Sequence, residues 1–75
     1  MASDASRFSL RPPHVVRLRS LAKGPKVYRA GDSLNLTLVR RGLIEATGQA
    51  APPLRREYAI TDQGRAALRE ADRAN

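Results

Sequence analysis

The sequence predicts one small α+β domain that contains about three helices and a two- or three-stranded antiparallel sheet. Segments with helical periodicity alternate with short β-prone runs, and glycine or proline separates them. With 75 residues, the chain can build only one thin hydrophobic core. We expect residues 1–11, which are polar and rich in serine, to form a flexible N-terminal tail, and residues 12–75 to form the domain.

The first part of the domain predicts a helix followed by a short strand. The helix is expected to begin at Pro12, because proline is tolerated in a first helical turn, and a Gly-Pro pair at 24–25 ends it. Four apolar side chains share one face of this helix: Val15, Leu18, Leu21 and Ala22. The β-prone run Lys26–Arg29 predicts the strand, and residues 30–32 predict a turn.

The segment Ser33–Arg41 fits two structures. Its leucines alternate, which is typical of a strand. However, Asp32 or Ser33 supplies a helix N-cap, two arginines at the other end complement the helix dipole, and Gly42 follows where glycine often ends a helix. These start and stop signals favour a helix. The alternative is a β-hairpin that turns at residues 40–42.

The second half of the chain predicts a hairpin and a final helix. Leu43–Thr47 and Glu57–Thr61 are β-prone, and the nine residues between them include one glycine and two prolines. We therefore expect a long hairpin tip at Gly48–Arg56. Thr61 is positioned to cap a helix that continues through Ala74. One face of that helix carries small residues suited to close packing: Gly64, Ala67, Leu68 and Ala71.

Two runs in this half carry a family resemblance. Residues 38–45 read LVRRGLIE, and residues 58–68 read YAITDQGRAAL. With a hairpin between them, the runs resemble the wing half of the winged helix-turn-helix domains of MarR and PadR regulators. They are also similar to small phage and prophage proteins with the same layout. The resemblance covers about residues 34–71, and the scanning helix of the family is missing or reduced to the strand at 26–29. It implies a reduced winged helix that binds duplex DNA as a transcription regulator of phage or prophage type.

Basic residues are concentrated in the first half of the chain. The chain carries 14 Lys and Arg against 7 Asp and Glu, which gives a formal net charge of +7. Residues 7–41 hold nine basic and one acidic side chain, whereas residues 42–75 hold five of each. This asymmetry indicates a polyanionic partner. The alternative is a solvated basic surface that binds nothing.

We expect three groups of side chains to contact the duplex. The helix at 33–41 is expected to bury Leu34, Leu38 and Val39. It then exposes side chains suited to base edges and phosphates, namely Asn35, Thr37, Arg40 and Arg41. The hairpin tip offers Arg55 and Arg56 to a phosphate or to the minor groove. The first helix and the segment after it add Arg17, Arg19, Lys23 and Lys26. The alternative is that the polar residues belong to an ordinary first turn and that the arginines only complement the helix end or solvate a loop.

The composition does not favour catalysis. A nucleophile, a base and an orienting group must share one pocket, yet the chain has one histidine and no cysteine. A core this thin is also expected not to enclose a pocket of about 300 Å³. We expect no enzyme activity, no cofactor and no metal site.

The expected partner is duplex DNA, and the expected setting is the cytoplasm, without membrane contact. No long heptad or strongly apolar face is present, so we expect a monomer or a weak homodimer. Two other functions stay open. One is a protein-interaction module or inhibitor that places its basic face on an acidic protein partner, and the other is a structural part of a larger assembly.

Overall fold

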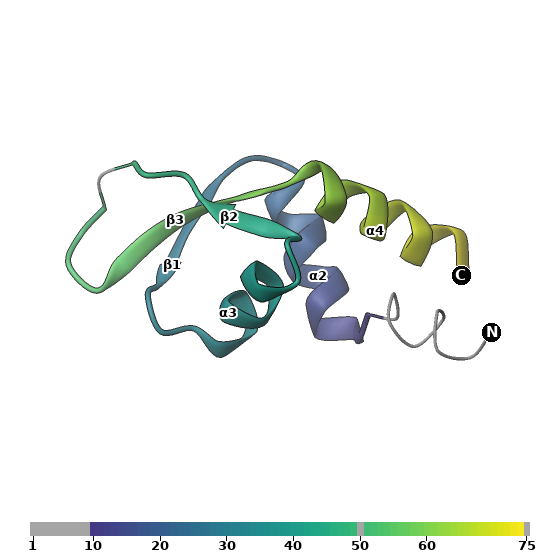
Figure 1. Ribbon diagram of the computed structural model, residues 1–75, viewed down its shortest axis with the longest axis horizontal. Coiled ribbons are helices and arrows are strands. Elements are labelled where there is room, and N and C mark those ends of the chain that lie inside the picture. Colours follow the sequence, from purple (N-terminus) through teal and green to yellow (C-terminus); the bar gives the residue numbers. More distant parts are fainter. Residues whose placement is uncertain (1–9, 50, 75) are drawn as a thin grey trace.

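The computed structural model describes residues 10–49 and 51–74, and this part of the chain forms three helices and a three-stranded antiparallel sheet (Figure 1). In chain order the elements are α2 (Pro12–Leu21), β1 (Lys26–Arg29), α3 (Ser33–Arg40), β2 (Ile44–Ala46), β3 (Arg55–Ile60) and α4 (Asp62–Ala74). This arrangement confirms the predicted α+β class and is compatible with a reduced winged helix.

β3 is the central strand of the sheet, whose order is β1-β3-β2. Both neighbouring strands run antiparallel to it, with Tyr28 opposite Arg56 on one side and Ile44 opposite Ile60 on the other. Because successive side chains of a strand point to opposite faces, Tyr58 and Ile60 share one face, and both are buried. The three helices pack against this face (Figure 1). The alternate side chains therefore lie on the opposite face, which none of the described helices covers.

The hydrophobic core lies between the covered face of the sheet and the helices. Its buried members are Leu18, Leu21, Leu38, Leu43, Ile44, Tyr58, Ile60 and Leu68. Val15 and Ala22 are partly buried against this core, which confirms the apolar face predicted for the first helix. On α4, the buried and half-buried positions are the predicted small-residue face: Gly64, Ala67, Leu68 and Ala71.

The segment Ser33–Arg40 is a helix, as its start and stop signals predict, and the hairpin alternative is wrong. At the start, Asp32 Oδ1 accepts a backbone N–H of the first turn at 2.9 Å. At the end, Gly42 has a φ of 76°, and the Leu43 N–H donates to the Leu38 carbonyl oxygen at 2.9 Å. This is a glycine-terminated helix end, so the chain passes from α3 directly into β2.

β3 begins at Arg55, two residues earlier than the sequence predicts. Arg55 and Arg56 are therefore not in the hairpin tip but in a strand, opposite Arg29 and Tyr28 of β1. The prediction considered only β2 as the partner of the returning strand. β1 is a second partner, and it continues the ladder beyond the end of β2. Leu54, with a φ of 65°, turns the chain into this strand.

Two residues of the predicted tail, Leu10 and Arg11, contact the domain. Leu10 is half-buried and packs against the core. Arg11 is the N-cap residue of α2, and its carbonyl oxygen accepts the N–H groups of His14 and Val15 at 2.9 and 3.1 Å. Burial of an apolar side chain such as Leu10 stabilises this attachment. The remainder of the predicted tail, residues 1–9, lies outside the described residues.

The start of α4 is fastened to the turn between α3 and β2. Thr61 Oγ1 accepts the Gly64 N–H at 3.0 Å, which confirms the predicted cap, and it donates to the Gly42 carbonyl oxygen at 2.7 Å. The Gly64 backbone lies very close to its neighbours. A Cβ at this position would overlap the Leu43 carbonyl oxygen and lie 2.7 Å from Ile60 Cγ1. The close approach of α4 therefore requires glycine at this position.

Arg17 links α2, β1 and α3 through one guanidinium group. Its Nη1 donates to Asn35 Oδ1 at 2.6 Å and lies 3.4 Å from Asp32 Oδ1, while its Cζ lies 4.3 Å from the centre of the Tyr28 ring. The Arg17 and Asp32 side chains are only 22% and 26% exposed, so water screens their attraction less than it screens a surface ion pair. A hydrogen bond from a charged donor, such as the one to Asn35, contributes about 1.5–3 kcal/mol. This network joins the first helix to the start of α3.

Replacing Gly64 with alanine is expected to lower the free energy of unfolding by about 1–3 kcal/mol, because the clash with Leu43 outweighs the gain in helix propensity. Urea unfolding followed by circular dichroism measures this change. Gly31→Ala is the matched control, since a Cβ at Gly31 meets no atom within 4 Å. That variant is expected to gain up to about 1 kcal/mol. Equal effects at the two positions would contradict the close approach of α4.

The Arg17–Asn35 hydrogen bond is expected to show strong coupling in a double-mutant cycle. Arg17→Met leaves the buried Asn35 oxygen unpaired, and Asn35→Leu removes the acceptor 2.6 Å from Arg17, so each is expected to cost about 1.5–3 kcal/mol. The double variant removes both polar groups and is expected to be about 1–2 kcal/mol more stable than the sum of the single effects implies.

The control cycle uses the exposed pair Arg19–Asp72 with Arg19→Gln and Asp72→Asn. Coupling there is expected to be about 0.5 kcal/mol or less, since surface ion pairs contribute little. Similar coupling in both cycles would show that the Arg17 network has no special role in stability.

Candidate nucleic-acid interface

α3 exposes a different set of side chains from the predicted one. Asn35 is 0% exposed, whereas Val39 is 39% exposed. The predicted exposure of Asn35 is therefore wrong, and its side chain is not available to a base edge. Its oxygen accepts the Arg17 hydrogen bond, and its Nδ2 is buried with no hydrogen-bond partner among the described residues.

The rotation of α3 explains this difference. Viewed down the axis of α3, Asn35 and Val39 lie on the same side of the direction in which Leu34 and Leu38 point. Asn35 is closer to that direction than Val39 is. Polarity alone assigns Asn35 to the outside and Val39 to the inside. Arg17, on another helix, supplies a charged donor that satisfies the buried Asn35 oxygen, and the helix turns Val39 outward instead. Burying a polar group is tolerated where a hydrogen bond compensates it.

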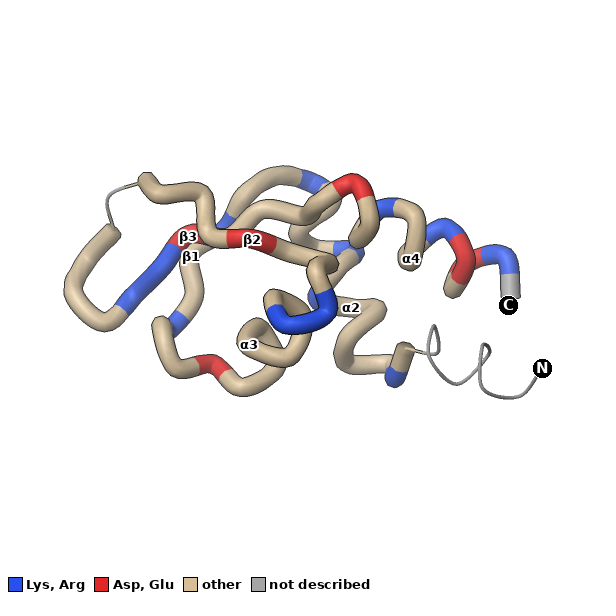
Figure 2. The backbone as a smooth tube through the Cα atoms, in the orientation of Figure 1, with Lys and Arg blue, Asp and Glu red and all other residues tan. Residues whose placement is uncertain are grey.

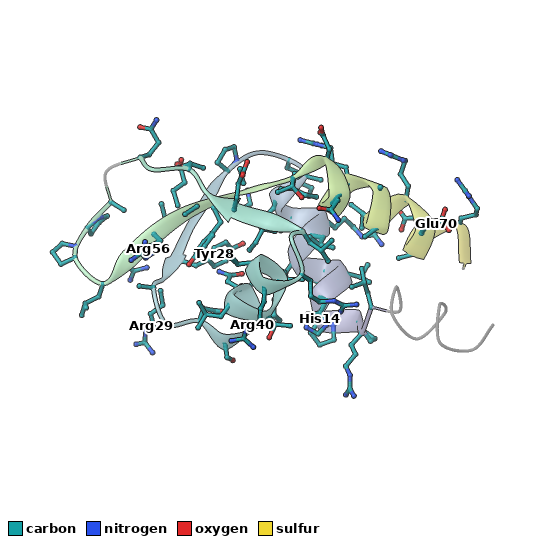
Figure 3. The ribbon with its side chains drawn as sticks, in the orientation of Figure 1. His14, Tyr28, Arg29, Arg40, Arg56 and Glu70 are labelled. Atoms are coloured by element: carbon teal, nitrogen blue, oxygen red, sulfur yellow. The ribbon has the colours of Figure 1, made fainter. Side chains whose placement is uncertain are left out.

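The other candidates on α3 differ in how much they meet solvent. Thr37 is half-buried, and its Oγ1 donates to the Ser33 carbonyl oxygen at 3.1 Å, so the hydroxyl serves the backbone of its own helix. Arg40 and Arg41 are exposed at the end of the helix, as predicted. Figure 3 shows the Arg40 side chain on this helix. Leu36, 42% exposed, lies one turn before Arg40.

Two candidates on α2 are held by other side chains of the protein. Arg17 belongs to the network with Asn35, and Arg19 Nη2 lies 2.8 Å from Asp72 Oδ1 of α4. Lys23 is exposed in the connection after α2, and Lys26 is half-buried in β1. Of the four basic residues predicted in this region, Lys23 is thus the one that is exposed and has no ion pair in the described structure.

Three arginines gather at the end of the sheet that extends beyond β2. Arg29 and Arg55 are register partners, and Arg56 lies opposite Tyr28. All three arginines are exposed, and Figure 3 shows Arg29 and Arg56 at this end of the molecule. Within residues 10–49 and 51–74 none of the three forms an ion pair. Arg29 is not among the predicted site residues, because only the β1–β3 register places it beside Arg55.

The positive charge does not form one continuous face. Figure 2 shows Lys and Arg positions on β3, at the end of α3, in the connection after α2 and along α4. α4 is balanced, since its sequence holds three arginines and three carboxylates. Among the described residues, ion pairs join Arg17 to Asp32, Arg19 to Asp72 and Arg73 to Glu70. Exposed basic residues without a described ion pair therefore include Arg40 at the end of α3 and Arg29, Arg55 and Arg56 at the end of the sheet, together with Arg11 and Lys23.

The described surface has two partly open hollows of about 430 Å³ each, so the small core does not prevent a hollow of pocket size. One lies between Leu10, Leu43 and α4, and the other lies beside Leu54 and the start of β3. Neither lining contains serine, cysteine or histidine. In the described part of the chain, no three His, Cys, Asp or Glu side chains are placed to hold a metal ion. None of the described helices has the length and apolar character needed to cross a membrane.

No protein-family model, no curated protein and no solved structure matches this chain. The architecture of three helices on one face of a three-stranded sheet is compatible with a reduced winged helix. The resemblance of residues 34–71 to the wing half of that family stays a prediction.

Proposed function

We propose that this chain is a small DNA-binding module that contacts the phosphates of a duplex and acts as a transcription regulator. The observation that carries the proposal is the position of its excess positive charge. Arg40 at the end of α3 and the arginines at the end of the sheet are exposed, and no described carboxylate pairs with them. Side chains of this type neutralise phosphates and release the counterions that surround DNA.

Contacts to the sugar–phosphate backbone carry this binding. Asn35 is buried and cannot contact a base edge, and the Thr37 hydroxyl donates to the Ser33 carbonyl oxygen of its own helix. Arginine at a helix end and on a strand can still donate to phosphate oxygens, which position a protein on a duplex without reading sequence. The expected binding is therefore salt-sensitive and only weakly selective for sequence.

A protein partner with an acidic surface is the second candidate function, and one observation favours it. The exposed face of α3 combines Leu36 and Val39, 42% and 39% exposed, with Arg40. Exposed apolar side chains beside an arginine are typical of protein interfaces, where apolar burial and charge act together. Leu36 and Val39 cannot donate hydrogen bonds to phosphate oxygens, so phosphate contacts do not account for their exposure.

Titration of a random-sequence duplex into the protein at two salt concentrations separates the two candidates. DNA binding is expected at micromolar protein and should weaken steeply with salt. With about 4–6 phosphate contacts, the slope of log affinity against log salt is about −4 to −5. Absence of duplex binding at low salt, with a folded monomer, would contradict the proposal and favour the acidic protein partner.

Arg40→Gln is expected to weaken duplex binding about 3- to 10-fold and to reduce the magnitude of the salt slope by about 1. Its melting temperature should be nearly unchanged, because the exposed side chain makes no ion pair in the described structure. Arg65→Gln on α4 is the matched control, with the same loss of charge on a helix whose charges are balanced. Equal weakening in both variants would mean that only net charge matters and that α3 is not part of the interface.

A further inference from the structure

The register of the sheet brings two arginines face to face. Arg29 of β1 lies opposite Arg55 of β3 at the last pair of the ladder. The Ala30 N–H donates to the Leu54 carbonyl oxygen at 2.9 Å, so the next pair outward is hydrogen-bonded. Hydrogen-bonded and non-hydrogen-bonded pairs alternate in an antiparallel ladder, which makes Arg29 and Arg55 a non-hydrogen-bonded pair. Cα atoms in such a pair lie only about 4.5 Å apart, and the side chains leave the sheet side by side.

The two arginines point away from the core. Arg56 lies two residues before the buried Tyr58 on β3, so these two side chains share the covered face. Arg55 and its register partner Arg29 therefore lie on the opposite face, which none of the described helices covers. Exposure of both side chains agrees with this direction. Like charges directly opposite each other destabilise a sheet. The protein therefore keeps an unfavourable pair in a position where a neutral residue would fit.

No described carboxylate compensates this pair. Glu57 is the nearest acidic residue on the same face, opposite Val27, and its Oε1 accepts the Thr47 hydroxyl at 2.6 Å on the side of β2. Asp32, which follows β1 in the chain, lies beside Arg17. Glu45 is exposed in β2, at the other end of the sheet.

Arg56 adds a third arginine at the same end of the sheet. It is exposed and lies opposite Tyr28, so it leaves the strand on the other face, at the same end of the sheet (Figure 3). Arg29 and Arg55 thus have a charged neighbour along β3 and no acidic one in contact. An anion placed between Arg29 and Arg55 would attract both guanidinium groups, and these two attractions would offset the repulsion between the arginines.

We propose that Arg29 and Arg55 form a clamp for a single phosphate group. Each guanidinium group presents a planar set of donors that matches two phosphate oxygens, and two such groups side by side can hold one phosphate from both sides. The clamp itself rests on the β1–β3 register. Its assignment to a phosphodiester of nucleic acid rests on the proposed function, whereas free phosphate has the same chemistry.

The clamp predicts opposite effects on stability and on binding. Arg29→Gln and Arg55→Gln each remove the like-charge repulsion, so each is expected to raise the melting temperature in a phosphate-free buffer by about 1–5 °C. Inorganic phosphate is expected to raise the melting temperature of the unchanged protein at constant ionic strength, because it binds the folded state, and to lose this effect in both variants. Both variants should also bind a duplex with a salt slope smaller in magnitude by about 1.

Two control variants separate the clamp from general charge. Arg65→Gln on α4 loses the same charge and is expected to keep the full response to phosphate. Arg29→Lys keeps the charge but replaces the planar donors with a point charge. It is expected to retain the low melting temperature and to respond less to phosphate.

Each alternative result has a definite meaning. A lower melting temperature in both Gln variants, or an equal response to phosphate in these variants and the unchanged protein, would overturn the clamp. Duplex binding unchanged in both variants would overturn it as the nucleic-acid contact and leave the proposed function standing. Stabilisation by phosphate that depends on Arg29, without any duplex binding, would support the clamp, assign it to free phosphate and overturn the proposed function.

Discussion

The hydrogen bond from Arg17 to Asn35 determines how the domain presents α3. It couples the first helix to a buried amide, and the same guanidinium group lies near the Asp32 cap and over the Tyr28 ring. Among the apolar residues of this eight-residue helix, Leu38 is buried and Leu34 is half-buried, so few apolar contacts fix how the helix is rotated. The charged donor satisfies the buried Asn35 oxygen, so Asn35 lies inside and Val39 joins Leu36 and Arg40 on the exposed side. The outer surface of α3 is thus a consequence of an interaction inside the protein.

The arginines of this chain have two different roles. Arg17 and Arg19 pair with side chains of other elements, Arg17 with Asn35 and Asp32 and Arg19 with Asp72 of α4, although a count of charges along the sequence groups them with the arginines that face outward. Arg29, Arg55 and Arg56 have no such internal partner among the described residues, and their strands bring them together. The location of an uncompensated charge, rather than the net charge of +7, is therefore what supports a binding surface.

Local signals predict most of the elements, whereas long-range contacts decide the site. The Asp32 cap and Gly42 identify α3 as a helix because both act within a few residues of its ends. The small-residue face of α4 likewise predicts its close packing, which Gly64 makes possible. The burial of Asn35 depends on a donor 18 residues earlier in the chain, and the meeting of Arg29 with Arg55 depends on strand register. Neither contact leaves a periodic pattern in the sequence.

The strand order leaves β1 and β2 as the two edges of the sheet. An open edge offers unpaired backbone groups to the edge of another molecule and favours aggregation. Here the edges are only four and three residues long, and β1 begins and ends with a cationic side chain, Lys26 and Arg29. Short edges with repelling ends are poor templates for β-pairing between copies, so the positions of these two charges disfavour the growth of the sheet from one molecule into the next.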